Sequence, residues 1–172
     1  MKKIVFSIVI GILLSCGEEQ SSITDKTISD ELAKHKAQDS LETTTKEFIE
    51  AYVAAINTPD WKANITEYLE PDSDNFLKQH TAFRASFPNY KSTIKHLIVD
   101  GDEAIVWLNN TATYTSTYTF EDIDIQEVFN GIEAKNQNIT WHETWFFNVV
   151  EGRFGGKWDF LKDNYAVLDG LK

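Results

Sequence analysis

Hydrophobic residues recur at two different spacings along the chain, a helical spacing in the first half of the folded region and a strand spacing in the second. The helical pattern is clearest in the run Phe48, Ile49, Tyr52, Val53 and Ile56. Thr44 and Glu47 stand three residues apart, which is the spacing of a capping box. The pattern therefore predicts a first domain helix that begins near Thr44.

Two further helices are expected before residue 88. Thr58-Pro59 provides a cap followed by a proline at the first helical position, and predicts a second helix. A third helix is predicted to begin after Asp72 or Ser73 and to stop at Pro88. Its apolar face would carry Phe76, Leu77, His80, Phe83 and Phe87.

Beyond Tyr90 the period changes to two, which is typical of strands with one buried face. The pattern predicts four strands, with turns at Asp100-Gly101-Asp102 and Glu151-Gly152: Tyr90–Asp100, Glu103–Phe120, Ile139–Val150 and Arg153–Asp163. Helices followed by an antiparallel meander predict an α+β domain of about 130 residues with one core.

The first residues resemble a bacterial lipoprotein signal. Two lysines precede an apolar run, Ile4–Leu14, and then Leu13-Leu14-Ser15-Cys16. This run is well below the roughly 20 residues that a helix needs to cross a bilayer, so it predicts a removable signal peptide over residues 1–15. Cys16 is the only cysteine in the chain. We expect it to carry the acyl chains that anchor the protein in the cell envelope.

The net charge of the chain limits the molecules and membrane surfaces that it is expected to bind. The net charge of −11 repels nucleic acid and also anionic lipid headgroups, so the acyl chains alone would hold the protein at the membrane. Gly17 follows the cysteine where an aspartate commonly retains lipoproteins at the inner membrane, and Glu18-Glu19 come next. These residues favour the outer membrane and leave the leaflet open.

Residues 16–40 form the lipidated cysteine and a polar segment, expected to be a disordered or loosely helical tether. Asp39-Ser40-Leu41 fits a short pattern that some bacteria glycosylate, although a plain linker is the simpler interpretation. The folded domain is predicted over residues 41–172.

Four strings in this domain, taken together with the order of its elements, resemble the NTF2-like superfamily and its SnoaL-like branch. They are residues 48–57, 83–90, 97–107 and 151–154, the last followed by Trp158 and Asp163. The resemblance implies an NTF2-like, cystatin-like cone, in which a curved antiparallel sheet packs around about three N-terminal helices and encloses a pocket. Two features depart from the family pattern: the usual Gln-Leu-Gly ending is replaced by residues 167–171, and no short hairpin is evident between Tyr68 and Phe76.

Four residues are the main candidates for acid–base chemistry: Glu143, Asp163, Asp159 and His96. In the strand Ile139–Val150 the odd-numbered face is almost entirely apolar, which would place Glu143 among tryptophans on the concave side. Desolvation there would favour the neutral form of the carboxyl group and suit it to proton transfer. The structural alternatives are pairing of Glu143 with Arg84, Arg153 or a tyrosine hydroxyl, or a strand twisted enough to expose it.

The family resemblance directs attention to Asp163, because SnoaL-like cyclases use an acid at the end of the last strand to move a proton beside a carbonyl. Asp163 matches that place within one residue, an offset that a β-bulge at Gly155-Gly156 would absorb. Asp159 is the alternative if no bulge forms. A simple role in capping the next turn is equally compatible with Asp163.

Histidines complete the candidates. His96 alternates with Ile94 and Ile98 and would then face the pocket, or else bond to backbone in the core. His80 has the same ambiguity with weaker support. The sequence has no paired cysteines or clustered ligands at metal-binding spacing, and no phosphate-binding glycine loop, so neither a metal nor a cofactor is expected.

Aromatic residues are concentrated in the predicted strands. Those expected to line a pocket are Trp107, Tyr114, Trp141, Trp145, Phe147 and Trp158. A filled core, or a homodimer formed through the sheet, is the alternative use of the same residues.

Two functional hypotheses follow. The first is an envelope-anchored module that binds a small apolar or aromatic ligand or a partner protein. The second is a SnoaL-like lyase, isomerase or hydrolase that moves a proton on a carbonyl compound, with Asp163 as the general acid or base.

Overall fold

The structure is a computed structural model, and it describes residues 18–120 and 127–172, with side chains from residue 25 onwards. The predicted signal peptide, Cys16 and the acidic segment 121–126 lie outside the described residues. Within the described part, no helix is sufficiently long and apolar to span a membrane.

Helix α1 covers Glu18–Ile56, so it includes most of the predicted tether as well as the first predicted domain helix. Its residues up to Gln38 belong to one compact unit, and residues from Asp39 onwards belong to a second unit that contains everything else. The predicted cap at Thr44 is wrong. The helix continues through that position, and the Thr44 hydroxyl donates instead to the carbonyl of Ser40 one turn earlier, at 3.0 Å.

Two shorter helices follow. Helix α2 is Trp61–Thr66, which begins two residues later than predicted because the Thr58 hydroxyl donates back to the carbonyl of Ala55. Helix α3 is Asp74–Ser86, with Ser73 at its N-cap position and its end just before Pro88, and both bounds agree with the prediction.

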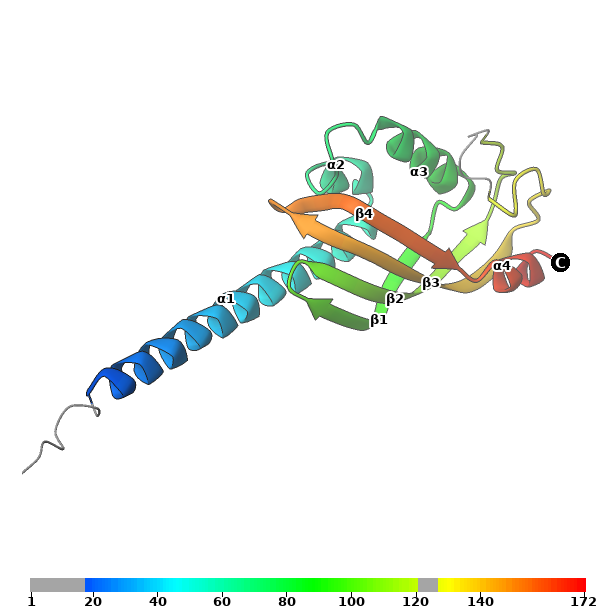
Figure 1. The fold of residues 1–172 in the computed structure, drawn as a ribbon. Coiled ribbons are helices and arrows are strands. Elements are labelled where there is room, and N and C mark those ends of the chain that lie inside the picture. Colours follow the sequence, from blue (N-terminus) through cyan, green and yellow to red (C-terminus); the bar gives the residue numbers. More distant parts are fainter. Residues whose placement is uncertain (1–17, 121–126) are drawn as a thin grey trace, which may run out of the picture. The chain divides into compact units, whose positions relative to one another are not determined.

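The rest of the second unit is one antiparallel sheet in the order β1-β2-β3-β4, as Figure 1 shows. Its strands are β1 (Lys91–Asp100), β2 (Glu103–Tyr114), β3 (Gln137–Val150) and β4 (Arg153–Lys162). All four predicted strands are present, although β2 ends six residues earlier than expected. At that point the Tyr114 hydroxyl accepts from the backbone N–H of Tyr118 and donates to the carbonyl of Ile132, so the chain leaves the sheet.

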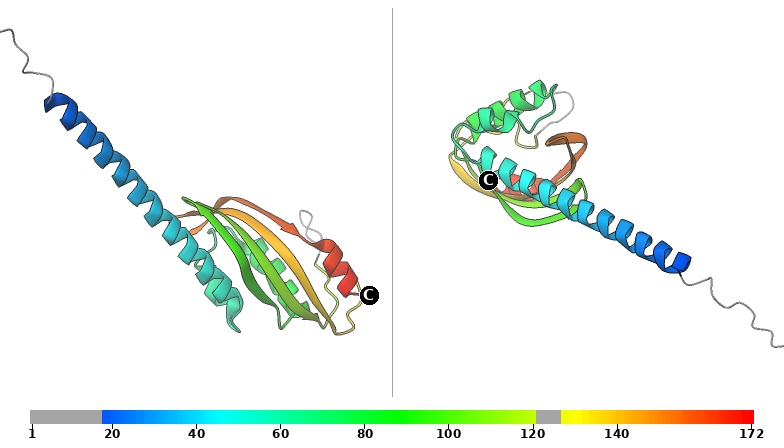
Figure 2. Two further views of the ribbon diagram at one scale, coloured as in Figure 1. Left: turned by 90° about the horizontal axis from the view of Figure 1, so that it is seen from below. Right: turned by 90° about the vertical axis from the view of Figure 1, so that its left-hand side faces the viewer.

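The sheet is curved, and its concave face is covered by the last turns of α1 together with α2 and α3 (Figures 1 and 2). The core between them is aromatic. Tyr52 and Phe48 of α1 pack edge-on against Phe154 of β4, with ring centroids 4.6 and 5.1 Å apart. The predicted α+β cone of the NTF2-like type is confirmed.

The sheet contains two register shifts, and only the first changes which side chains face the core. In β1, Ile94 pairs with Leu108 while His96 pairs with Trp107, so Lys95 is an extra residue that exchanges the faces beyond it. In β4, Phe154 pairs with Val149 while Trp158 pairs with Phe147, so two extra residues are accommodated between them. Two residues leave the alternation of faces unchanged.

Helix α4 (Asn164–Gly170) closes the second unit by packing on β3. A side chain at Gly170 would overlap Cγ2 of the buried Ile139, whereas one at Gly156 would meet nothing within 4 Å. Because Ile139 is β-branched and held in the sheet, it cannot move aside easily.

We therefore expect Gly170→Ala to destabilise the fold by about 1–3 kcal/mol, as overpacking of a filled core does. Gly156→Ala should change the free energy of unfolding by less than about 0.5 kcal/mol. Urea denaturation of both variants measures the difference, and equal effects would refute the close packing of α4 on β3.

Candidate functional site

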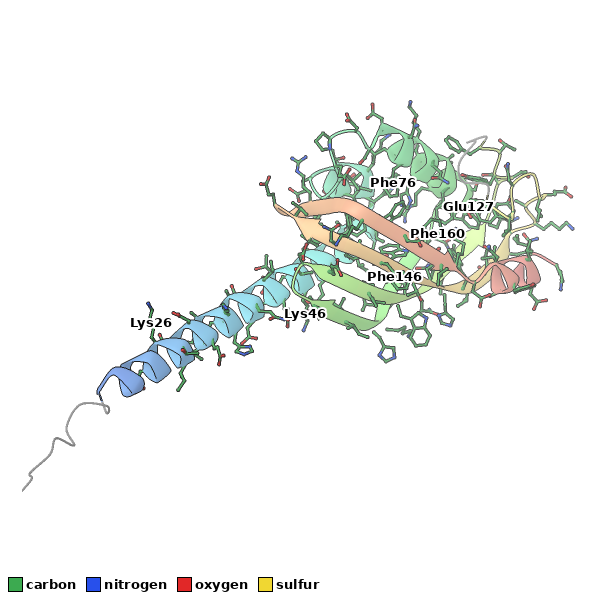
Figure 3. All side chains as sticks on the ribbon, viewed as in Figure 1. Lys26, Lys46, Phe76, Glu127, Phe146 and Phe160 are labelled. Carbon is green, nitrogen blue, oxygen red and sulfur yellow. The ribbon has the colours of Figure 1, made fainter. Side chains whose placement is uncertain are left out.

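A cavity of about 390 Å³ lies between the concave face of the sheet and the helices. Aromatic side chains are the largest group in its wall. Its lining residues come from α1, α3, β3, β4 and the segments between them: Tyr52, Ile56, Leu69, Glu70, Ser73, Phe76, Gln79, His80, Phe83, Tyr90, Glu127, Glu143, Trp145, Phe154, Gly155, Gly156, Trp158, Phe160 and Lys162. Figure 3 labels three of them, Phe76, Glu127 and Phe160, between α3 and β4. Such a lining suits a small, largely apolar molecule.

Glu143 is the charged group at the centre of β3, and its carboxylate is held by two indoles. Trp141 Nε1 donates to Oε1 at 2.8 Å, and Trp145 Nε1 donates to Oε2 at 2.9 Å. The three residues alternate on one face of β3, so the strand itself brings them together. Glu143 is only 8% exposed, and an indole N–H can only donate. Both carboxylate oxygens therefore act as acceptors.

Lys162 provides the positive charge of the site. Its Nζ donates to both oxygens of Glu127, at 2.6 and 2.7 Å, and lies 3.7 Å from Oε1 of Glu143. The ammonium also lies 5.8–6.0 Å from the ring centroids of Phe83, Phe129 and Phe160. The three charged side chains are nearly buried, with exposed fractions of 8–13%. We call Glu127, Lys162 and Glu143 the charge cluster.

His80 of α3 lines the same cavity and is neutral. Its ring lies between those of Phe76 and Phe83, stacked on each at 5.6 and 5.8 Å. Burial lowers the pKa of His80 to about 3, and the positive charges of Arg84 and Lys162 contribute to this shift. Its Nε2 is buried and makes no hydrogen bond with the described residues. A neutral imidazole with a free ring nitrogen can donate to or accept from a bound molecule.

Two tyrosines on the cavity wall are also neutral. Burial, and secondarily the negative charge of Glu143, raises the pKa of Tyr52 and of Tyr90. The Tyr90 hydroxyl donates to Oδ1 of Asn110 at 3.1 Å. Arg84 lies behind this wall, 5.4 Å from the Tyr90 ring centroid, and donates to the carbonyls of Ile56 and Tyr90.

The structure brings four of the sequence candidates to this cavity. The residues Glu143, Trp145, Trp158 and His80 line it, and the expectation that Glu143 lies among tryptophans on the concave face is confirmed. The alternative, in which Glu143 pairs with an arginine or a tyrosine hydroxyl, is not found, since two indoles and Lys162 surround the carboxylate. Trp141 does not line the cavity and acts from behind by orienting Glu143.

Asp163 and Asp159 do not line the cavity. The bulge at Gly155 and its neighbours exists, but it adds two residues, so the inward positions near the end of β4 are Phe160 and Lys162. Asp163 is exposed and caps α4, with its Oδ1 accepting from Ala166 N at 3.0 Å. Asp159 is exposed as well and accepts from the next backbone N–H. The bulge therefore does not turn Asp163 towards the cavity, as a bulge of one residue would have done.

His96 also lies away from the cavity, because the extra residue Lys95 turns it to the outer face of the sheet. There its ring stacks on Trp107, with centroids 5.1 Å apart, and Trp107 is 39% exposed. The expected placement of His96 and Trp107 towards the pocket is wrong. Tyr114 and Phe147 face inward but are buried in the core beside the cavity.

Sequence reasoning missed Lys162 and Glu127. Lys162 could have been found by pairing β4 with β3, since it stands opposite Glu143 in the register. Glu127 follows the segment 121–126, and no periodic pattern places it. Among the described residues, no group of three or more potential ligands is arranged to hold a metal ion.

A curved sheet around helices, closed over an aromatic cavity with a few buried polar groups, defines the chain as an NTF2-like protein of the SnoaL type. The model of the SnoaL-like polyketide cyclase family matches residues 46–171. The chain belongs to this family. No curated protein matches the chain.

Solved structures of similar fold agree with this assignment. AclR, a proposed hydroxylase from Streptomyces galilaeus, has a TM-score of 0.61 and 20% identity, over 76% of this chain and 96% of that one. A proposed SnoaL-like polyketide cyclase from Jannaschia has a TM-score of 0.56 and 18% identity, over 76% and 93%. An LEH-like epoxide hydrolase from M. tuberculosis has a TM-score of 0.55 and 13% identity, over 76% of this chain and 90% of that one. At these identities the likeness concerns the fold.

The neutral state of His80 predicts a pH dependence of stability. The unfolded chain binds a proton at His80 below its ordinary pKa of 6.5, whereas the folded protein binds it only near pH 3. The contribution of the neutral His80 to the free energy of unfolding is therefore complete above pH 6.5 and is lost as the pH falls. Between pH 7 and pH 5 we expect His80 to cost about 2 kcal/mol of stability.

His80→Phe should remove this part of the pH dependence, because phenylalanine retains the stacking and does not titrate. Urea denaturation of both proteins at pH 7 and pH 5 measures it. Parallel losses in the two proteins would contradict a buried, neutral His80.

Proposed function

We propose that the domain is an enzyme that moves a proton on a small, largely apolar carbonyl compound bound in the cavity, with Glu143 as the general base. The observation that carries the proposal is the Glu143 carboxylate, pinned by two indoles beside a cavity and accompanied by a neutral histidine with a free ring nitrogen. A base held in one orientation by fixed donors is ready for proton abstraction.

The step is an ordinary enolisation. The bond between hydrogen and the carbon next to the carbonyl breaks, the proton passes to Glu143, and the electron pair moves to the carbonyl oxygen. Lys162 and, in the tautomer that carries hydrogen on Nε2, His80 are the available donors for that oxygen. Donors fixed in a dry site stabilise such a developing charge more strongly than water does. Return of the proton to another atom completes an isomerisation. In a ring closure the enolate carbon instead forms a bond to a second carbonyl carbon of the same molecule, whose oxygen takes the electron pair and then the proton.

Membership of the SnoaL-like polyketide cyclase family supports this chemistry, and the aromatic side chains in the lining support the binding of a small ligand. The proposal differs from the sequence hypothesis in the residue that moves the proton. Asp163 is occupied in capping α4, so the role passes to Glu143.

Replacing Glu143 tests the assignment. We expect Glu143→Gln to lower the rate of deuterium uptake beside the carbonyl of accepted ketones by at least about a hundredfold, since the base is lost. The measurement is NMR of a panel of aromatic and alicyclic ketones in D₂O. Asp163→Asn is the matched control, because asparagine caps helices as well as aspartate does, and it should leave the rate nearly unchanged. Exchange that survives in the first variant, or disappears in the second, would overturn the assignment.

We also propose that the protein is exported and anchored in the cell envelope through Cys16. The lysine pair, the short apolar run and the single cysteine support this, as does the strongly negative charge, which gives the protein surface no affinity of its own for anionic lipid.

Cys16→Ser should therefore abolish incorporation of labelled fatty acid and move the protein from the detergent phase to the aqueous phase in a detergent-partitioning experiment. Retention of the label by the variant would place the acyl chains elsewhere, and an unlabelled native protein would exclude the anchor.

A further inference from the structure

The charge cluster contains two carboxylates and one ammonium. Glu127 receives two short hydrogen bonds from Lys162, at 2.6 and 2.7 Å, whereas Glu143 is 3.7 Å from the same Nζ. Lys162 therefore belongs mainly to Glu127. The indoles on Glu143 are neutral, so they orient its charge without cancelling it.

Among the described residues that line the cavity, no side chain besides Lys162 supplies a positive charge. His80, Tyr52 and Tyr90 are neutral, for the reasons given above. Arg84 lies behind Tyr90, and Glu70 adds a further negative charge at an exposed position. The cavity is thus an aromatic chamber whose buried polar end carries one excess negative charge.

We propose that this charge balance selects the substrate: the cavity binds neutral and cationic aromatic or apolar compounds and rejects those that carry a carboxylate. In an environment of low dielectric constant, a third negative charge next to Glu127 and Glu143 is strongly disfavoured. An organic cation gains attraction from Glu143 and from the faces of the aromatic rings. The inference rests on the proposed function in its use of the same cavity, and it names the class of compound that this function would act on.

Three naphthalene compounds of similar size serve as probes: 2-naphthalenemethanol is neutral, 2-naphthoate is anionic and 2-naphthylmethylamine is cationic at pH 7. Isothermal titration calorimetry of the full chain in detergent, with detergent alone as the blank, gives the three dissociation constants. We expect the naphthoate to bind at least about tenfold more weakly than the alcohol, and the amine at least as tightly as the alcohol. Equal affinity for the alcohol and the naphthoate would overturn the proposal.

We define the discrimination as the ratio of the dissociation constant of naphthoate to that of the alcohol. Two substitutions in the charge cluster should change this ratio in opposite directions. Glu127→Gln leaves Lys162 free to pair with Glu143, which makes the cluster neutral, so the discrimination against naphthoate should fall towards unity. Lys162→Met leaves two carboxylates, so the discrimination should increase. Glu103→Gln is the matched control: it removes a carboxylate from the exposed ion pair with Lys157 and should leave the ratio unchanged. A ratio that does not change in Glu127→Gln would refute the role of the cluster.

The overall charge of −11 could also repel naphthoate, and salt separates the two causes. At about 0.5 M NaCl the Debye length is only about 4 Å, so repulsion by the surface is screened while the buried cluster is affected much less. The discrimination should persist at this salt concentration, and its disappearance would assign it to the surface. The binding experiment does not depend on turnover. If the charge preference is found but no ketone exchanges deuterium, the proposed catalysis is refuted and the charge selection stands.

Discussion

The site depends on one constraint, which is that a carboxylate buried in an aromatic interior must find donors there. An unpaired ion in such surroundings costs several kcal/mol. Trp141 and Trp145 meet this requirement from the same strand as Glu143, one on each oxygen. Because two indoles of β3 point their N–H groups at one side chain, they are more than hydrophobic filling. The aromatic face of the sheet is thereby turned into the wall of a polar site.

The same constraint explains the arrangement of Lys162 and Glu127. An ammonium at this depth also needs acceptors, and Glu127 supplies both of its oxygens. Three aromatic rings surround the remaining sides of the cation at 5.8–6.0 Å. The result is a set of charges that satisfy one another in pairs and leave Glu143 directed towards the cavity. The contacts that compensate these buried charges are therefore also the contacts that orient Glu143 for chemistry.

Periodicity predicted the elements of this fold well, because each predicted strand carries a regular alternation bounded by turn residues, such as Gly101 and Gly152 with φ of 61° and 74°. It also placed Glu143 correctly. It failed where the alternation is interrupted. One extra residue at Lys95 sent His96 outward, and the bulge near Gly155 has two extra residues instead of the one that would have turned Asp163 inward. Bulges depend on backbone pairing between strands, which a single strand's pattern does not reveal. Contacts such as Lys162 with Glu127 join distant parts of the chain and have no local signal.

The bulge of β4 has a consequence for how such a domain can acquire new chemistry. The length of the segment from Gly155 to Lys157, and not the identity of its residues, decides which half of the following strand is presented to the cavity. Loss of a single residue there would move Asp159, Leu161 and Asp163 into the inward positions now held by Trp158, Phe160 and Lys162, and so replace a cationic wall with an acidic one in one step. Loss or gain of two residues would keep the same face of the strand inward.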